Sequence, residues 1–305
     1  MRISTSWSHQ LAVNAMLDQQ AKLSETQLKL SSNKKYLTPS ENPVAATSLI
    51  DLEQNIKESE QYQVNIGAAR QRLGLEESSL SNATDALQSI QDLALRGLNG
   101  SISPENRKQI AEEIDLLKDQ LLGIANTKNA NGEYIFSGYK TDQKAFTHDD
   151  SVPPVYTYQG DTNQRKIEIG PDRQVADGDP GNEVFGNILP DPLTLGSIEN
   201  VFQAIETLSA GLKNNTPDPA SLGDISKALE RFSTVRASVG ARMNALDVQE
   251  NRNADYILDN KSTASEIGDL DYAEALSKFN LQEIALQAAQ QAYVKVQNLS
   301  LFNYM

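Results

Sequence analysis

The side chains best suited to chemistry form few groups in this sequence. The only histidines are His9 and His148, and His148 is followed by two aspartates, Asp149 and Asp150. Imidazole and carboxylate groups are common ligands of divalent metals. Two prolines follow within five residues, however, and a polar turn at the surface explains this run better than a metal site. We therefore expect no metal ligands here.

A second acidic stretch runs from Asp177 to Glu183 and reads Asp-Gly-Asp-Pro-Gly-Asn-Glu. Its spacing matches a calcium-binding loop only in part, and the expected flanking helices are of the wrong kind. The chain has no Gly-x-Ser-x-Gly elbow, no phosphate-binding glycine loop, no zinc-ligand spacing and no cysteine. We predict no catalytic residues, no cofactor and no bound metal, and hence a protein that is not an enzyme.

Composition narrows the remaining classes of function. The chain has 305 residues and a formal net charge of -14, which disfavours binding to nucleic acid or to an anionic membrane. No run of about 18 apolar residues is present, so no transmembrane helix is predicted. The first twenty residues do not resemble a secretory signal peptide. If the protein is extracellular, we expect another export route.

The longest regular pattern lies between Leu52 and Gly97. Apolar or small residues recur every seven positions in a first register: Leu52, Ser59, Ile66, Leu73, Leu80, Leu87 and Ala94. A second register follows three residues later: Asn55, Tyr62, Ala69, Glu76, Ala83, Ile90 and Gly97. This spacing predicts a coiled-coil helix roughly 70 Å long. It fits either a helical hairpin within an ordinary domain or a rod-shaped subunit that packs lengthwise against copies of itself.

Further helices can cover this seam. Ser103 and Pro104 are typical of a helix start, and the apolar residues that follow predict an antiparallel partner for the long helix. Helix is expected again from about 197, and a second long helix from the residue after Pro219 towards Ser262. The predicted rod core comprises Leu52, Ile66, Leu73, Leu80, Leu87, Ile110, Ile114, Leu117, Leu121, Leu229, Phe232 and Met243.

Both ends of the chain are also predicted to be helical. The last helix, about 271–299, has apolar stripes on opposite sides, which indicates neighbours on both sides. The predicted subunit-interface residues are Leu11, Met16, Leu17, Leu23, Leu28, Leu30, Phe279, Ile284, Leu286, Tyr293 and Leu299. We expect 1–42 and 265–305 to be largely disordered or only marginally ordered in the free monomer, because they have little to bury. The alternative is that these interface residues only pair the two terminal helices within one molecule. Contacts within the molecule and contacts between subunits can also occur together.

The middle of the chain has a different character. Short β-rich runs at 134–136, 155–158 and 166–169 are separated by Gly, Pro, Asp and Asn. The fold class expected is therefore mainly α, with long antiparallel coiled-coil helices from both halves and a small inserted β domain. The expected division is 1–42 with 265–305 as the inner, self-assembly domain, 43–135 with 197–264 as the rod, and 136–196 as a β-rich outer domain.

Several segments resemble the flagellin family of bacterial flagellar proteins. They are Leu30-Ser31-Ser32-Asn33, the run from Ser40 to Ala46, the run from Arg236 to Asn244, and Asp271-Tyr272-Ala273-Glu274-Ala275. Within that family, other segments are similar to hook–filament junction proteins rather than to flagellin itself. These are Met1-Arg2-Ile3-Ser4-Thr5, the run from Ala125 to Asp142, Tyr158-Gln159-Gly160-Asp161 and Ile167-Glu168-Ile169-Gly170.

The resemblance implies a structural subunit that joins the hook to the filament by helical self-assembly of its terminal helices. The implied partners are copies of itself, the first junction protein, flagellin and, before secretion, an export chaperone. The implied location is the extracellular flagellum, reached through the flagellar secretion apparatus. Two alternatives stay open: a minor flagellin that forms the filament, and a soluble helical adaptor or adhesin that binds a ligand through 136–196.

Overall fold

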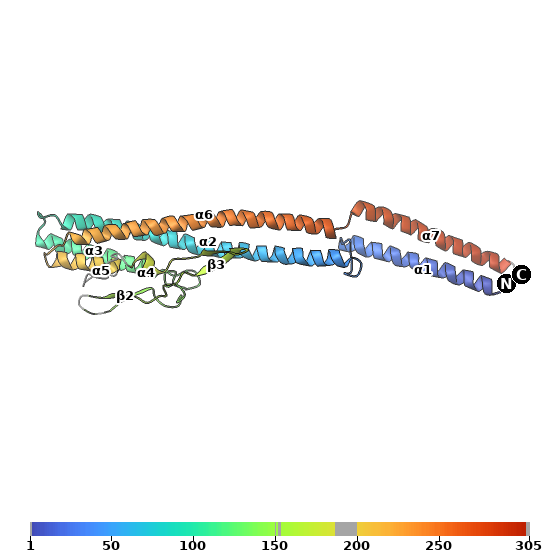
Figure 1. Cartoon of the computed structure of the whole chain (residues 1–305), viewed down its shortest axis with the longest axis horizontal. Helices are drawn as coiled ribbons and strands as arrows, with labels where there is room; N and C mark the ends of the chain where they lie inside the picture. Colours follow the sequence, from blue (N-terminus) through green and yellow to red (C-terminus); the bar gives the residue numbers. More distant parts are fainter. Residues whose placement is uncertain (1, 150, 152–153, 187–199, 303–305) are drawn as a thin grey trace. The chain divides into compact units, whose positions relative to one another are not determined.

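The computed structural model describes residues 2–149, 151, 154–186 and 200–302, and side chains are described within 7–295 except at position 8. Its elements, in chain order, are α1 Arg2–Ser32, α2 Pro43–Gly97, α3 Pro104–Ala125, β1 Phe146–His148, β2 Tyr156–Tyr158, β3 Lys166–Gly170, β4 Arg173–Ala176, α4 Gly181–Val184, α5 Val201–Lys213, α6 Ala220–Gly268 and α7 Tyr272–Phe302. The expectation of a mainly helical chain with a small inserted β region is confirmed (Figure 1).

The chain divides into two compact units. The first, which we call the terminal unit, comprises Met1–Glu58 and Asp255–Met305, and the second, the central unit, comprises Ser59–Ala254. The long helices α2 and α6 contribute to both. The finer division into inner, rod and outer domains stays a prediction, and residues 187–196 of the expected outer domain lie outside the described residues.

Local sequence signals explain where the helices begin. Ser103 caps α3, because its Oγ accepts a hydrogen bond from the backbone N–H of Asn106 at 3.3 Å, and Pro104 is the first residue of the helix. Pro43 begins α2, where Asn42 Oδ1 accepts from the backbone N–H of Ala45 at 3.1 Å. The backbone N–H of a residue in the first turn has no partner within the helix, so a proline at this position costs no hydrogen bond.

In the central unit α2 and α6 run antiparallel (Figure 1). Gln63 Nε2 donates to the carbonyl of Glu250 at 2.8 Å, while Gln91, further along α2, donates to Ser226 Oγ at 3.0 Å. Between these points the two seven-residue registers of α2 face the core. Their buried members from position 59 on are Ser59, Tyr62, Ile66, Ala69, Leu73, Glu76, Leu80, Ala83, Leu87, Ile90, Ala94 and Gly97.

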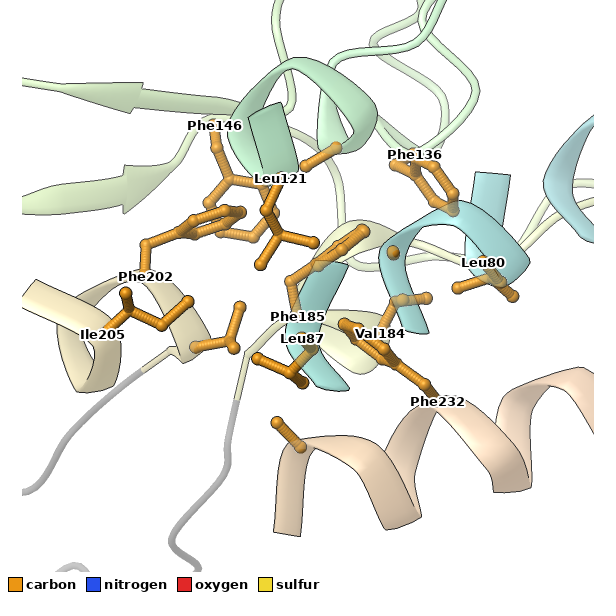
Figure 2. Packing of buried hydrophobic residues seen from close by; sticks show 14 of the residues in the cluster. Leu80, Leu87, Leu121, Phe136, Phe146, Val184, Phe185, Phe202, Ile205 and Phe232 are labelled. Atoms are coloured by element: carbon orange, nitrogen blue, oxygen red, sulfur yellow. The ribbon is translucent and has the colours of Figure 1, made fainter. Parts of the chain in front are cut away.

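Aromatic residues from the β region complete this core (Figure 2). Phe185, which follows α4, is fully buried, and its ring centroid lies 5.2 Å from that of Phe136 and 5.3 Å from that of Phe232 on α6. Phe146 on β1 contacts Phe202 on α5, with ring centroids 5.0 Å apart. Helices and inserted β region therefore share one hydrophobic core.

The strands form two antiparallel pairs. In the first, Phe146 of β1 pairs with Tyr158 of β2, and in the second, Lys166 of β3 pairs with Ala176 of β4. Strands were expected at 155–158 and 166–169, and β2 and β3 lie there. The strand expected at 134–136 was wrong: Tyr134 forms only an isolated bridge with Lys128. That apolar run reflects burial, since Ile135 and Phe136 are 3% and 0% exposed.

The later helices differ slightly from expectation. The helix expected to reach about Ser262 continues to Gly268 as α6. Helix α5 begins at Val201, where Asn200 Oδ1 accepts from the backbone N–H of Gln203 at 2.9 Å. The start expected at about 197 lies outside the described residues.

Candidate assembly surface

The residues expected to form the rod core have graded exposure. Seven have no exposed surface: Ile66, Leu73, Leu80, Leu87, Ile114, Leu121 and Phe232. Ile110 is 7% exposed, and Leu117, Leu229 and Met243 are partly buried against the same cluster. Leu52 is half-buried and belongs to the terminal unit. Most of these residues therefore belong to the core described above.

In the terminal unit α1 and α7 lie side by side and antiparallel (Figure 1). Tyr272 Oη donates to the backbone carbonyl of Leu30 at 2.8 Å, at the start of α7 and the end of α1. Further along, Gln19 Nε2 donates to the carbonyl of Gln282 at 3.4 Å. The rings of His9 and Tyr293 meet edge to face, with centroids 5.1 Å apart. These contacts define one continuous seam.

The seam has the alternating three- and four-residue spacing of a coiled coil. Its less exposed members on α1 are His9, Ala12, Met16, Gln19, Leu23, Thr26 and Leu30, and those on α7 are Ala275, Phe279, Gln282, Leu286, Ala289 and Tyr293. Among the described side chains of the two helices, only Thr26 and Ala275 are more than nine-tenths buried. Small and polar residues thus occupy about half of the seam, which is much thinner than the core of the central unit.

Helix α1 carries a second apolar stripe that its seam does not cover. It contains Trp7, Leu11, Leu17 and Leu28, which are 69%, 57%, 58% and 55% exposed. At 100° per residue these four positions fall within about 120° of arc, on the side opposite Met16, Leu23 and Leu30. The stripe therefore points away from α7.

Helix α7 has the same two-sided character. Leu276, Leu281, Ile284 and Val294 are between 52% and 66% exposed, and they lie away from the face that carries Phe279, Leu286 and Tyr293. Surface leucines are common when they occur singly. A row of them along each helix of one pair is the kind of exposed apolar surface that marks an interaction site.

The predicted interface residues fall on both sides of the helix pair. Leu11, Leu17, Leu28 and Ile284 are exposed, whereas Met16, Leu23, Leu30, Phe279, Leu286 and Tyr293 are half-buried along the seam. Leu299 belongs to α7, but its side chain lies outside the described residues. Trp7, Leu276, Leu281 and Val294 were not among the predicted residues. Trp7 stands one turn before Leu11, and that spacing could have identified it.

Ionic contacts fix the corner between α1 and α2. The carboxylate of Glu41 accepts hydrogen bonds from the backbone N–H of Leu37 at 3.0 Å and of Thr38 at 3.2 Å. The same carboxylate pairs with Lys29 at 2.7 Å, and the hydrogen bond from Lys29 lowers the pKa of Glu41. The turn thereby holds the end of α1 against the residues before α2.

His148 and Asp149, from the run considered first as a source of metal ligands, contact neighbouring side chains and backbone groups of the β region. His148 stacks on Tyr156, and Asp149 Oδ1 accepts hydrogen bonds from Ser151 and from the backbone N–H of Val155, while Asp150 lies outside the described residues. Within the described residues no group of three or more His, Cys, Asp or Glu is arranged to hold a metal ion. None of the helices described is both long and apolar enough to span a bilayer.

Sequence and structure comparisons agree with this architecture. Residues 3–141 match the bacterial flagellin N-terminal helical region, and residues 222–305 match the bacterial flagellin C-terminal helical region. The chain is 30% identical over 318 residues to flagellar hook-associated protein 3 of Escherichia coli (strain K12), covering 99% of each protein. It is 29% identical, with the same coverage, to the protein of that name from Salmonella typhimurium.

A solved structure shows the same fold. The crystal structure of the flagellar junction protein FlgL from Legionella pneumophila aligns with a TM-score of 0.58 and 24% identity, covering 73% of this chain and all of that one. At that identity the likeness concerns the fold alone. The full-length relatives and the two matched regions together carry the assignment. The chain belongs to the flagellin family of flagellar structural proteins and, within it, to the hook-associated protein 3 group.

Proposed function

We propose that this chain is the subunit that joins the hook to the flagellin filament. The relatives named above are hook-associated proteins, and the aligned Legionella protein is called a junction protein. The observation that carries the proposal is the pair of outward apolar stripes on α1 and α7. A subunit that must hold neighbours on several sides needs such surfaces, whereas a soluble monomer does not.

Assembly proceeds through these stripes. Each copy presents Leu11, Leu17 and Leu28 on one helix, and Leu281 and Ile284 on the other, to terminal helices of neighbouring copies. Full burial of one such side chain contributes about 1.5–3 kcal/mol. Several side chains per contact, repeated around a ring, are enough to hold the assembly although each helix pair is thin.

Different neighbours occupy the two ends of this assembly. Copies of the same chain lie beside it, the first junction protein lies on the hook side, and flagellin lies on the filament side. Before secretion a flagellar export chaperone covers the exposed helices, and the flagellar secretion apparatus exports the chain to the cell exterior. The protein works by binding these partners and has no catalytic role.

The terminal helices 1–42 and 265–305 act as the inner, self-assembly domain, 43–135 with 197–264 as the rod, and 136–196 as the outer domain. In the free chain the terminal helices are only marginally ordered, because their seam buries so little. They become fully ordered when neighbours cover the second stripe. The seam and the outer stripes thus have separate roles, one within the subunit and one between subunits.

The test replaces Leu28 and Ile284 together by glutamate in a strain whose own copy of the gene is deleted. A matched control replaces Leu116, a 71% exposed leucine on α3 in the central unit, by glutamate. We expect the double variant to be exported and soluble, while cells lack filaments and release unassembled flagellin into the medium. The control variant restores normal filaments.

Two outcomes contradict the proposal. Normal filaments with the double variant would show that the outward stripes do not carry assembly. Normal filaments in the deletion strain itself would favour a minor flagellin over a junction subunit. The position of labelled protein on isolated flagella, at the hook end or along the filament, then decides between those two functions.

A further inference from the structure

A cluster of charged side chains lies inside the central unit, where the segment after β4 crosses α2 and α6. Glu76 on α2 is 1% exposed, and Asp177 and Asp179 on the crossing segment are 1% and 6% exposed. The backbone N–H of Asp179 donates to Glu76 Oε1 at 3.1 Å. Segment 177–180 is thus attached directly to a carboxyl group of α2.

Each of the three arginines around this cluster has a carboxylate of its own. Arg242 on α6 pairs with Asp179, and it also donates to the carbonyl of Ala176 at 3.3 Å. Arg165 makes a bidentate pair with Asp177, in which Nε donates to Oδ1 at 3.1 Å and to Oδ2 at 2.9 Å, and NH2 donates to Oδ2. Such bidentate pairing satisfies both partners.

The third arginine, Arg72, lies one turn before Glu76 on α2 and pairs with Glu133, with NH1 donating to Oε2 at 3.4 Å. Each of the three cations thus pairs with one of the three carboxylates other than Glu76, and Arg72 Nε is itself buried without a hydrogen-bond partner among the described residues. Glu76 is the fourth, and its Oε2 is buried without a hydrogen-bond partner among the described residues. A buried carboxylate without its own cation is costly, and such a group normally takes up a proton instead.

The backbone at Gly178 faces both of these α2 side chains. A methyl group at this position would lie 3.4 Å from Arg72 Nε and 3.8 Å from Glu76 Oε2, which is ordinary contact distance. The space between Gly178 and these side chains would accept one methyl group, so the direct contact of the crossing segment with Glu76 is the hydrogen bond from the Asp179 backbone N–H. A charge change on Glu76 would act directly on this contact.

We propose that Glu76 is protonated in the folded chain at neutral pH, and that its neutral carboxyl fastens segment 177–180 to α2 as an alkali-sensitive latch. The charged groups that face it are Arg72 on its own helix, Arg242 on α6, and Asp179 on the crossing segment, with Asp177, Arg165 and Glu133 around them. Burial, and then the negative charge of Asp179, raise the pKa of Glu76 well above its ordinary value, while Arg242 and the hydrogen bond from the Asp179 backbone N–H oppose them.

The sign of the coupling follows from the two states. Between the ordinary pKa of glutamate and the raised pKa in the fold, the folded chain holds a proton that the unfolded chain has lost. Stability contributed by this group is therefore complete in acid and is lost as pH rises towards the folded pKa. Over that range one proton changes the unfolding equilibrium constant about tenfold per pH unit.

The decisive measurement is carbon-13 nuclear magnetic resonance of the whole chain labelled at the glutamate side-chain carboxyl. We expect one glutamate to titrate well above all others, and Glu76→Gln to remove that signal. Asp179→Asn removes the nearest negative charge, so the same signal should then titrate at lower pH. A purely structural role for Glu76 gives no reason for that shift.

A second readout is the stability of wild type and of Glu76→Gln across pH. We expect the unfolding free energies of wild type and variant to converge in acid, and that of wild type to fall relative to the variant as pH rises. Over the same pH range, hydrogen exchange of the Asp179 amide in wild type, corrected for its intrinsic rate, should accelerate. If every glutamate of the wild type titrates in the ordinary range, Glu76 is ionised beside Arg72 and the proposal is wrong. That titration decides even if the variant fails to fold.

Discussion

Replacing Phe185 by alanine tests whether the inserted β region and the long helices fold as one unit. Phe185 has no exposed surface, and its ring contacts those of Phe136, Phe146, Phe202 and Phe232 at centroid distances between 5.2 and 5.8 Å. These rings come from the β region, from α5 and from α6 (Figure 2). Removing the central ring therefore weakens contacts on both sides at once.

The expected loss follows from the size of the cavity. A buried phenylalanine replaced by alanine costs about 3–5 kcal/mol. For a cooperative unit of the size of Ser59–Ala254, each kcal/mol lowers the melting temperature by about 2–4 °C, so we expect a drop of about 6–20 °C. The control Leu116→Ala changes a 71% exposed side chain and should alter stability by less than about 0.5 kcal/mol.

Hydrogen exchange resolved by mass spectrometry shows where the loss occurs. If the core is shared, peptides from α2 around Leu80–Leu87 and from α6 around Phe232 lose protection together with peptides from β1 and β2. If only the β strands lose protection and the helices exchange as in wild type, the inserted region is a separate folding unit. That result would refute the reasoning from the aromatic cluster.

Three further changes test local contacts. Ser103→Ala removes the cap of α3 and should cost about 1 kcal/mol in urea denaturation; no loss would mean that the cap is not formed in solution. Glu206→Ala leaves Lys118, whose side chain is 8% exposed, with the 3.3 Å contact to Asp115 and the Tyr156 ring centroid 5.8 Å from its Nζ, and should cost about 3 kcal/mol, whereas Glu206→Gln, which keeps a hydrogen-bond acceptor, should cost less. Burial opposes ionisation of Asp115, but hydrogen bonds from Lys213 and Ser209 and the charge of Lys118 bring its pKa below the ordinary 3.8. A lowered pKa stabilises the fold above that value and the benefit is lost as pH falls, so thermal denaturation of Asp115→Asn should show a weaker loss of stability in acid than wild type.

The parts of the fold that depend on local pattern could be predicted from the sequence. The seven-residue registers of α2 depend only on positions along one helix, and residues from Ile66 to Ile90 on these registers are buried as that pattern requires. Likewise the start of α3 at Pro104 depends on two adjacent residues, Ser103 and Pro104. Such signals do not depend on how distant segments meet.

Features that depend on distant segments could not be predicted in this way. Glu76 stands in an apolar register, and only the segment around Asp179, 103 residues away, explains why a carboxyl group is buried there. Strands β1 and β4 are short and have polar members, so their sequences carry little β signal before a partner is known. In the terminal helices both stripes are apolar, and the pattern alone does not tell which one forms the seam.

The pairing of α1 with α7 resolves that ambiguity and has a physical consequence. A pair of helices can bury only one face of each, so apolar stripes on two faces leave one of them in water. The large apolar side chains of α1 and α7 are divided between the two faces of each helix. Some seam positions therefore hold small or polar residues, namely Thr26, Ala275 and the hydrogen-bonded Gln19 and Gln282. A seam of this kind specifies register more than it adds stability. The same division of side chains that thins the seam therefore leaves an apolar stripe exposed on each helix, and these are the stripes that we propose as the contact surface for neighbouring subunits.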